Sequence, residues 1–327
     1  ISKTIIDTSF DETPEAPGVE LNIGETVTFE LIARIPEGQA PIIITDSLPS
    51  TPGILTIVSS EVTAIGGNLG GSILTVGDMG VINGQDIVFD FGTLTNTPDG
   101  MQNALDEIRI EVTAIVSQDP TTASGDVLVN TATLDYGLGE VSDTAEATVT
   151  EPVLNIDKSG APLTGDAGDV VDYTLVIDHD GASTGPAYDL VITDPLIGAL
   201  LTLNDGTVTA ESGCAAIPAA QIITGNGAGD SAIRIEVPLL EEGQTLTITY
   251  SGTLTQDTSY NQSLTNTATA DYDSNPSDDP ADGRAADQIS DDETFVTDAP
   301  DLAKEVFATE YDDTTGNQVN IGEDITY

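Results

Sequence analysis

Three short motifs recur in this chain in a fixed order and about one domain apart, and this repetition constrains the fold most strongly. The first motif reads Gly24-Glu-Thr-Val-Thr-Phe29, Gly168-Asp-Val-Val-Asp-Tyr173 and Gly322-Glu-Asp-Ile-Thr-Tyr327. The second reads Ile44-Thr-Asp-Ser-Leu-Pro49 and Ile192-Thr-Asp-Pro-Leu196. The third reads Asn130-Thr-Ala-Thr-Leu-Asp-Tyr136 and Asn266-Thr-Ala-Thr-Ala-Asp-Tyr272. A period this long indicates a tandem array of whole domains rather than a short-repeat solenoid.

The order of the motifs places the domain boundaries. We expect a first repeat at 1–150, a second at 151–298 and the truncated start of a third at 299–327, which makes the chain part of a longer array. The joins at 150–153 and 297–301 are short and contain proline. Short, proline-containing joins favour a semi-rigid string of domains over freely hinged ones.

Within each repeat the apolar residues follow a period of two or form short apolar runs, which is typical of β-strands. The predicted strands are 26–33, 87–91, 108–116, 170–177, 233–237 and 246–250. Clusters of Gly, Pro, Asn and Asp separate them, and only 101–107 suggests a helical turn. The chain is therefore predicted to be all-β, with tandem Ig-like (Greek-key) β-sandwich domains in an elongated array.

The chain is extremely acidic, with 56 Asp and Glu against 7 Lys and Arg and a net charge of −49. Such a chain repels nucleic acid and anionic membrane surfaces, and it contains no apolar run of transmembrane length. A single cysteine, Cys214, excludes an internal disulfide framework. A lone histidine, His179, is weak support for a catalytic set. We expect a secreted, non-enzymatic protein, because such a charge fits a saline or calcium-rich exterior better than a cytoplasm.

The three lysines of the chain each stand in the first predicted strand of a repeat. They are Lys3, Lys158 and Lys304. Side chains alternate between the two faces of a strand, and each lysine shares its face with apolar residues. These apolar residues are Ile1 and Ile5, Leu154 and Ile156, and Leu302 and Val306. All three lysines are therefore predicted to face the core.

Two more polar positions recur on core-facing sides. Asp46 and Asp194 each follow alternating apolar residues in the second motif, and Asn130 and Asn266 each begin the alternation of the third motif. An isolated charge buried in a core costs several kcal/mol, so Lys, Asp and Asn are expected to meet in each repeat.

A buried Lys, Asp and Asn in contact can carry out one reaction. Burial lowers the pKa of the lysine and raises that of the aspartate, so the pair can exist as a neutral amine and a neutral acid. The amine then attacks the side-chain carbonyl of Asn while Asp shuttles protons, and ammonia leaves. The product is an isopeptide bond, predicted to join the first and last strands of the repeat.

The three motifs together resemble the repeat domains of large bacterial surface proteins and the isopeptide-forming domains of fimbrial subunits and collagen-adhesin-type modules. The resemblance spans both full repeats and the start of the third. It implies cross-links Lys3–Asn130 assisted by Asp46 and Lys158–Asn266 assisted by Asp194. The partner of Lys304 would lie outside the sequence. The implied function is a stalk or filament module, with neighbouring repeats or further copies in a surface filament as partners.

Two alternatives stay open at this point. In the first, each lysine forms only a buried salt bridge with Asp46 or Asp194, and the asparagine caps a strand edge. In the second, the chain is an adhesin module that recognises glycan or protein through its end loops, although aromatic residues are only 4% of the chain and Trp is absent.

An acidic stretch near the end of the second repeat is a candidate calcium site. Its oxygen-bearing residues are Asp271, Asp273, Asn275, Asp278 and Asp279. Ca²⁺ takes six to eight oxygen ligands, but the spacing does not match an EF-hand, and a solvated loop is the competing interpretation. Asp178 and Asp180 form a weaker second candidate.

Overall fold

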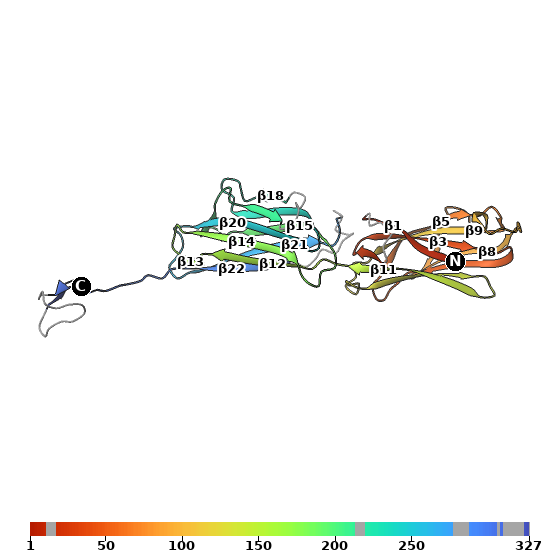
Figure 1. The fold of residues 1–327 in the computed structure, drawn as a ribbon, viewed down its shortest axis with the longest axis horizontal. Helices are drawn as coiled ribbons and strands as arrows, with labels where there is room; N and C mark the ends of the chain where they lie inside the picture. The colour runs from red at the N-terminus through yellow and green to blue at the C-terminus, as the bar shows by residue number, and fades with distance from the viewer. Residues whose placement is uncertain (11–17, 213–219, 277–287, 306–307, 310–323, 327) are drawn as a thin grey trace.

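The computed structural model describes residues 1–10, 18–212, 220–276, 288–305, 308–309 and 324–326. Its regular structure is almost entirely β, and it contains two β-sandwiches that lie end to end along the long axis of the molecule (Figure 1). The all-β sandwich architecture predicted from the sequence is confirmed. We call the two units the first and the second sandwich.

The first sandwich pairs two sheets that follow different strand orders. One sheet has the order β1-β3-β9-β5, and the other has the order β2-β11-β10-β4-β8-β6 with β7 also paired to β8. The strands of the first sheet are β1 (Ser2–Thr8), β3 (Thr26–Arg34), β9 (Glu107–Val116) and β5 (Leu55–Ile65). Those of the second are β2 (Val19–Asn22), β11 (Glu140–Thr150), β10 (Val127–Asp135), β4 (Gly38–Ser47), β8 (Asp86–Asn96), β6 (Leu69–Gly70) and β7 (Val81–Asn83).

The second sandwich repeats this topology. Its sheets have the orders β12-β14-β20-β16, with β17 also paired to β20, and β13-β22-β21-β15-β19-β18. The first sheet contains β12 (Leu154–Ala161), β14 (Val170–His179), β20 (Thr245–Leu254), β16 (Leu201–Leu203) and β17 (Thr209–Ser212). The second contains β13 (Thr164–Gly165), β22 (Ile289–Thr297), β21 (Ser263–Asp273), β15 (Ala187–Pro195), β19 (Ala232–Leu240) and β18 (Gln221–Thr224). Strand for strand, β12 therefore corresponds to β1, β15 to β4 and β21 to β10.

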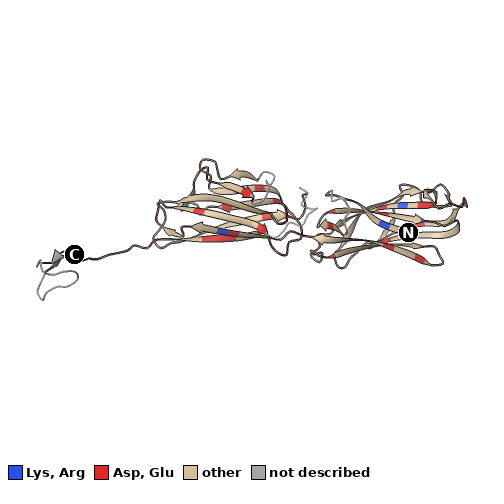
Figure 2. Cartoon of the chain, in the orientation of Figure 1, with Lys and Arg blue, Asp and Glu red and all other residues tan. Residues whose placement is uncertain are grey.

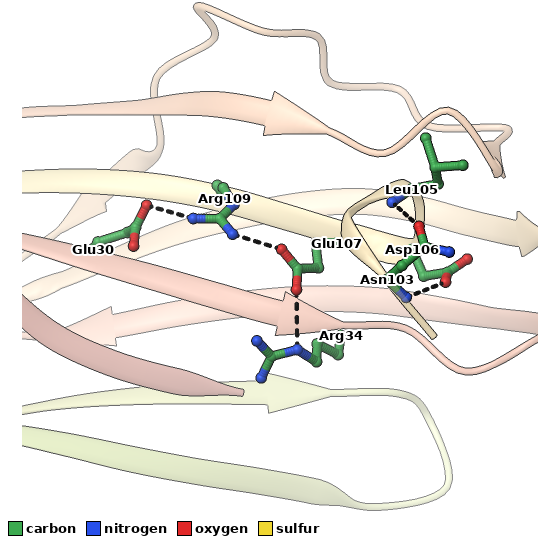
Figure 3. A network of polar contacts seen from close by, with 7 residues as sticks. All are labelled: Glu30, Arg34, Asn103, Leu105, Asp106, Glu107 and Arg109. Atoms are coloured by element: carbon green, nitrogen blue, oxygen red, sulfur yellow. Dashed lines mark hydrogen bonds and ion pairs between the residues drawn. The ribbon is translucent and has the colours of Figure 1, made fainter. Parts of the chain in front are cut away.

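The alternation of the sequence decides which side chains form the cores. In β3, Val27, Phe29 and Leu31 are buried while the residues between them are half-exposed. Each sandwich has its own hydrophobic core, because each pair of sheets buries its inner faces against one another. The helical turn expected at 101–107 is present as the 3₁₀ helix η1 (Ala104–Asp106), whose first turn is capped by the side chain of Asn103 (Figure 3).

The asparagine strands are the next-to-last strands of the sandwiches, so the prediction that the motif lies in the last strand is wrong. After β10 the chain turns at Gly137, which has a positive φ, and returns as β11, antiparallel to β10. β22 does the same after β21. β11 and β22 are rich in polar residues, and buried residues are confined to the second half of each strand, so their period-two signal is weak.

Acidic residues are spread over both sandwiches, whereas basic positions are few (Figure 2). Two of the arginines lie on β3 and β9 and are tied into one surface network (Figure 3). Arg34 binds Glu107 at 3.0 Å, and Arg109 binds Glu107 at 2.8 Å and Glu30 at 3.0 Å. These arginine side chains are substantially exposed, so the pairs contribute little to stability.

The two sandwiches are joined by hydrogen bonds as well as by the connecting chain. Ser274 and Asn275, after β21, both donate to the backbone carbonyl of Ile23 in the first sandwich, each at 3.2 Å. On another part of the joint, the hydroxyls of Ser124 and Thr184 lie 2.6 Å apart. The loop that carries Thr184 is itself held by His179, whose ring nitrogens bond the Ser183 hydroxyl and a backbone carbonyl of β19. The orientation of the sandwiches is therefore fixed by side chains from both.

We expect the double substitution Ser274→Ala/Asn275→Ala to loosen this joint. Each lost hydrogen bond contributes about 1 kcal/mol, and the carbonyl of Ile23 would be left to water. Small-angle X-ray scattering should then show a broader range of end-to-end dimensions, with the thermal unfolding of each sandwich unchanged. Thr265→Ala, on the exposed side of the preceding strand β21, is the matched control. Identical scattering profiles for all three proteins would contradict the prediction.

The described part of 299–327 contains only the short pair β23 (Ala308–Thr309) and β24 (Ile325–Thr326). Lys304 is exposed there, because the described residues around it form no sandwich, and its inward orientation in a complete repeat stays a prediction. The only helical element in the described part of the chain is η1, and no helix there is long and apolar enough to cross a bilayer.

Candidate functional site

The first sandwich brings Lys3, Asp46 and Asn130 together between its two sheets. Lys3 lies on β1, at the edge of one sheet, while Asp46 and Asn130 lie on the adjacent strands β4 and β10 of the other. Lys3 is 4% exposed, and Asp46 and Asn130 are completely buried. Alternation along three strands thus sends three polar side chains into one core, as predicted.

Asp46 is the centre of this cluster. The ammonium of Lys3 binds Oδ1 of Asp46, and the side-chain nitrogen of Asn130 donates to Oδ2 of the same carboxylate at 3.3 Å. The Lys3 nitrogen also lies 4.7 Å from the centre of the Phe29 ring. Among the described residues, the side-chain oxygen of Asn130 is buried without a hydrogen-bond partner. Such an orphaned carbonyl costs about 1–3 kcal/mol, which calls for an explanation.

Burial shifts both charged groups of the first site towards their neutral forms. Desolvation lowers the pKa of Lys3 to about 8, although the nearby carboxylates of Asp46 and Asp143 oppose the shift. Desolvation also raises the pKa of Asp46, against the effect of Lys3. The site therefore favours the neutral amine and the neutral acid far more than water does.

The second sandwich repeats the arrangement with one change. Lys158 on β12 binds Oδ2 of Asp194 on β15 at 2.6 Å, and both side chains are buried. Asn266 on β21 does not reach Asp194 directly: its side-chain nitrogen donates to the hydroxyl of Tyr250 at 2.9 Å, and Tyr250 donates to Oδ2 of Asp194 at 2.5 Å. The side-chain oxygen of Asn266 is again buried with no partner among the described residues. Burial lowers the pKa of Lys158 as well.

Two aspartates that hold the lysine strands escaped the sequence analysis. The backbone N–H of Lys3 donates to Asp143 of β11 at 2.8 Å, and that of Lys158 donates to Asp291 of β22 at 2.7 Å. These bonds tie the free edge of each first strand to the opposite sheet. Ser-Asp occurs at both places, at 142–143 and 290–291, so the same self-comparison that found the other motifs could have revealed it.

The calcium candidate remains a prediction. Asp271 accepts hydrogen bonds from Gln288, Asp273 accepts one from the backbone of Ser274, and Asn275 donates to the first sandwich. Asp278 and Asp279 lie outside the described residues, as does Cys214. Over the part of the chain that the structure describes, no three acidic, His or Cys residues are grouped as metal ligands would be. At the weaker candidate, Asp180 accepts from Asn155 and from the backbone of Ala182.

No protein-family model matches the chain, and no curated protein matches it in sequence. Among solved structures, it is similar to the C-terminal domain of the AgI/II polypeptide BspA of Streptococcus agalactiae, with 12% identity, a TM-score of 0.50, and 91% of this chain and 99% of that one covered. The collagen adhesin CNA of S. aureus matches over 90% of this chain and 92% of its own, with 14% identity and a TM-score of 0.32, which is too low to show a common fold. The resemblance to surface-adhesin-like β-sandwich domains is confirmed as one of fold.

Proposed function

We propose that this chain is a structural stalk or filament module of a bacterial cell-surface or secreted protein, in which each sandwich closes itself with a Lys–Asn isopeptide bond. The observation that carries the proposal is the repeated cluster of a buried lysine, a buried aspartate and a buried carboxamide with an orphaned oxygen. A salt bridge alone explains the Lys–Asp contact. It does not explain why a carboxamide with an unsatisfied carbonyl lies beside the ion pair in both sandwiches.

The first site contains each group that the reaction needs. Lys3 gives one proton to Asp46, and its neutral amine attacks the side-chain carbonyl carbon of Asn130, so that a new C–N bond forms. The bond from that carbon to the asparagine nitrogen then breaks. Asp46, which already accepts a hydrogen bond from this nitrogen, returns the proton to it, and ammonia leaves. Asp46 then takes the second proton from the former amine of Lys3, so the products are a neutral amide, ammonia and a protonated Asp46. The chain acts once on itself, so the protein is not an enzyme with turnover.

The isopeptide bond would give each sandwich an internal covalent cross-link, which disulfides cannot supply in this chain. The single cysteine leaves no internal disulfide to staple either core. By analogy with a disulfide, closing a loop of roughly 100 residues stabilises the fold by about 4–5 kcal/mol on the chain-entropy estimate. Covalently closed domains joined end to end at a fixed orientation suit a stalk that bears load.

Intact mass of the folded chain tests this proposal. We expect the mass to be lower than that of the sequence by two molecules of ammonia, one for each closed sandwich. Asn130→Ala and Asn266→Ala should each restore the mass of one ammonia, and tandem mass spectrometry should find the Lys3–Asn130 and Lys158–Asn266 peptides joined. Asn83→Ala, on the exposed strand β7, serves as the control and should still lose two. An unmodified mass would reduce both sites to buried salt bridges.

A further inference from the structure

The two candidate sites differ in how the aspartate reaches the asparagine. In the first sandwich Asn130 donates directly to Asp46, whereas in the second the hydroxyl of Tyr250 stands between Asn266 and Asp194. The strands that carry the three residues and the buried lysine–aspartate contact are repeated in both sandwiches. The inserted phenol is therefore a feature of one site alone.

Strand register identifies what Tyr250 replaces. In the second sandwich Tyr173 on β14 pairs with Tyr250 on β20, and in the first Phe29 on β3 pairs with Val112 on β9. Phe29 and Tyr173 end the two copies of the first motif, so Val112 is the counterpart of Tyr250. Val112 is buried and carries no polar group. The second site thus has a hydroxyl where the first has a methyl.

Packing and two hydrogen bonds hold the Tyr250 hydroxyl in place. The residue is 2% exposed, and its ring stacks on that of Tyr173 with centroids 5.0 Å apart and planes at 20°. The hydroxyl donates to Asp194 at 2.5 Å and accepts from the nitrogen of Asn266 at 2.9 Å. Burial and the Asp194 carboxylate raise the pKa of Tyr250, so the phenol keeps its proton. It is therefore in place to donate a proton on one side while it receives another.

We infer that Tyr250 is a catalytic residue of the second site, whose hydroxyl passes a proton from Asp194 to the departing nitrogen of Asn266. This inference rests on the proposed self-cross-linking. Lys158 attacks the carbonyl carbon of Asn266 and transfers one proton to Asp194, with which it is in contact. Once Asp194 carries this proton, the Tyr250 hydroxyl turns, so that it accepts from Asp194 and donates to the asparagine nitrogen. As the bond to that nitrogen breaks, Asp194 protonates the Tyr250 oxygen and Tyr250 gives its own proton to the nitrogen. Ammonia leaves, and Tyr250 ends as the neutral phenol with which it began. Asp194 takes the second proton from the former amine of Lys158 and ends as the neutral acid, so the products are a neutral amide and ammonia.

The substitution Tyr250→Phe removes the hydroxyl and keeps the ring. The full chain would be made by cell-free synthesis, and the joined Lys158–Asn266 and Lys3–Asn130 peptides would be followed over time by mass spectrometry. We expect closure of the second sandwich to slow by about 100-fold, the lower end of general acid–base contributions, while the first closes at the wild-type rate. Tyr173→Phe is the matched control, because it removes the neighbouring phenol and the first sandwich already has Phe29 at that position.

A solvent isotope effect separates proton transfer from simple packing. In the wild-type chain, closure of the second sandwich should slow more in deuterium oxide than closure of the first, because an extra proton is in flight. Tyr250→Phe should remove this difference, and limited proteolysis should confirm that its second sandwich is folded. Closure of the Tyr250→Phe sandwich at or above the wild-type rate, or an unchanged isotope difference, would overturn the role of Tyr250. Loss of no ammonia from either wild-type sandwich would instead overturn the proposed function.

Discussion

Asn130→Ala is expected to increase the length that the first sandwich releases under force from about 70 Å to about 500 Å. With the isopeptide bond in place, tension entering at Lys3 crosses directly to Asn130. Only the chain from Asn130 to Thr150 can then be pulled out, and a fully extended chain gains at most about 3.3–3.6 Å per residue. Without the bond, nearly the whole of 3–150 can unravel.

A bond between the first and last strands would leave no strand to be pulled out, whereas the strand order here leaves one strand unprotected. Because Asn130 lies on β10, the bond does not protect β11, which is held to β10 and β2 by backbone hydrogen bonds. Asn130 pairs with Ala145, and Thr150 leaves from the same end of the hairpin, so tension would open this hairpin from one end, bond by bond. A closed sandwich should therefore give a short, low-force extension and then resist.

Single-molecule force spectroscopy on the full chain measures both lengths. Asn83→Ala is the matched control and should behave as wild type, since its side chain lies on exposed β7 and touches neither site. In the second sandwich the unprotected segment is 267–297, which gives a short extension of about 100 Å in wild type. A wild-type first sandwich that releases about 500 Å would show that tension is not carried by a Lys3–Asn130 bond.

The sequence was enough to predict the strands that carry the candidate site. Alternation in β1, β4 and β10 placed Lys3, Asp46 and Asn130 on inward faces, because a period of two is fixed by strand geometry whatever the tertiary context. The same rule predicted Lys158, Asp194 and Asn266 in the second sandwich. Because the motifs keep the same order in both repeats, the lysine, aspartate and asparagine of each repeat could be assigned to one site.

The features that the sequence did not reveal depend on contacts between distant strands. Tyr250 looks like any other alternating core residue of β20, and only the register with β14 and the approach of β21 bring its hydroxyl between Asp194 and Asn266. β11 was missed because it is rich in polar residues and its first half is mostly exposed, so the sequence shows only a short apolar period there.

In Asn130→Ala, the free energy of unfolding of the first sandwich is expected to rise by about 3 kcal/mol between pH 8 and pH 10.5. This variant keeps Lys3 as a free amine. Burial lowers the pKa of Lys3 to about 8 in the folded chain, against 10.5 when it is unfolded. Between these values the unfolded state binds more protons than the folded state, so stability increases with pH. Below pH 8 both states are charged, and the full cost of burying the ammonium is present.

The charged groups that face Lys3 do not reverse the downward shift of its pKa, so stability still increases with pH. Asp46 from β4 and Asp143 from β11 both raise the pKa of the lysine, and desolvation outweighs them. Asn130 is not among the causes of the shift, so its removal leaves the lysine in a similar field. Urea denaturation followed by far-UV circular dichroism gives the free energies, with Lys3→Met/Asn130→Ala as the control that lacks the titrating group.

The wild-type chain should show no such rise. An isopeptide nitrogen is an amide and does not titrate in this range, so cross-linking removes the buried amine from the pH dependence altogether. The difference between wild type and Asn130→Ala therefore reports the chemical state of Lys3 without any measurement of mass. If wild type and Asn130→Ala gained the same stability between pH 8 and pH 10.5, Lys3 would be a free amine in both and the buried cluster only an ion pair.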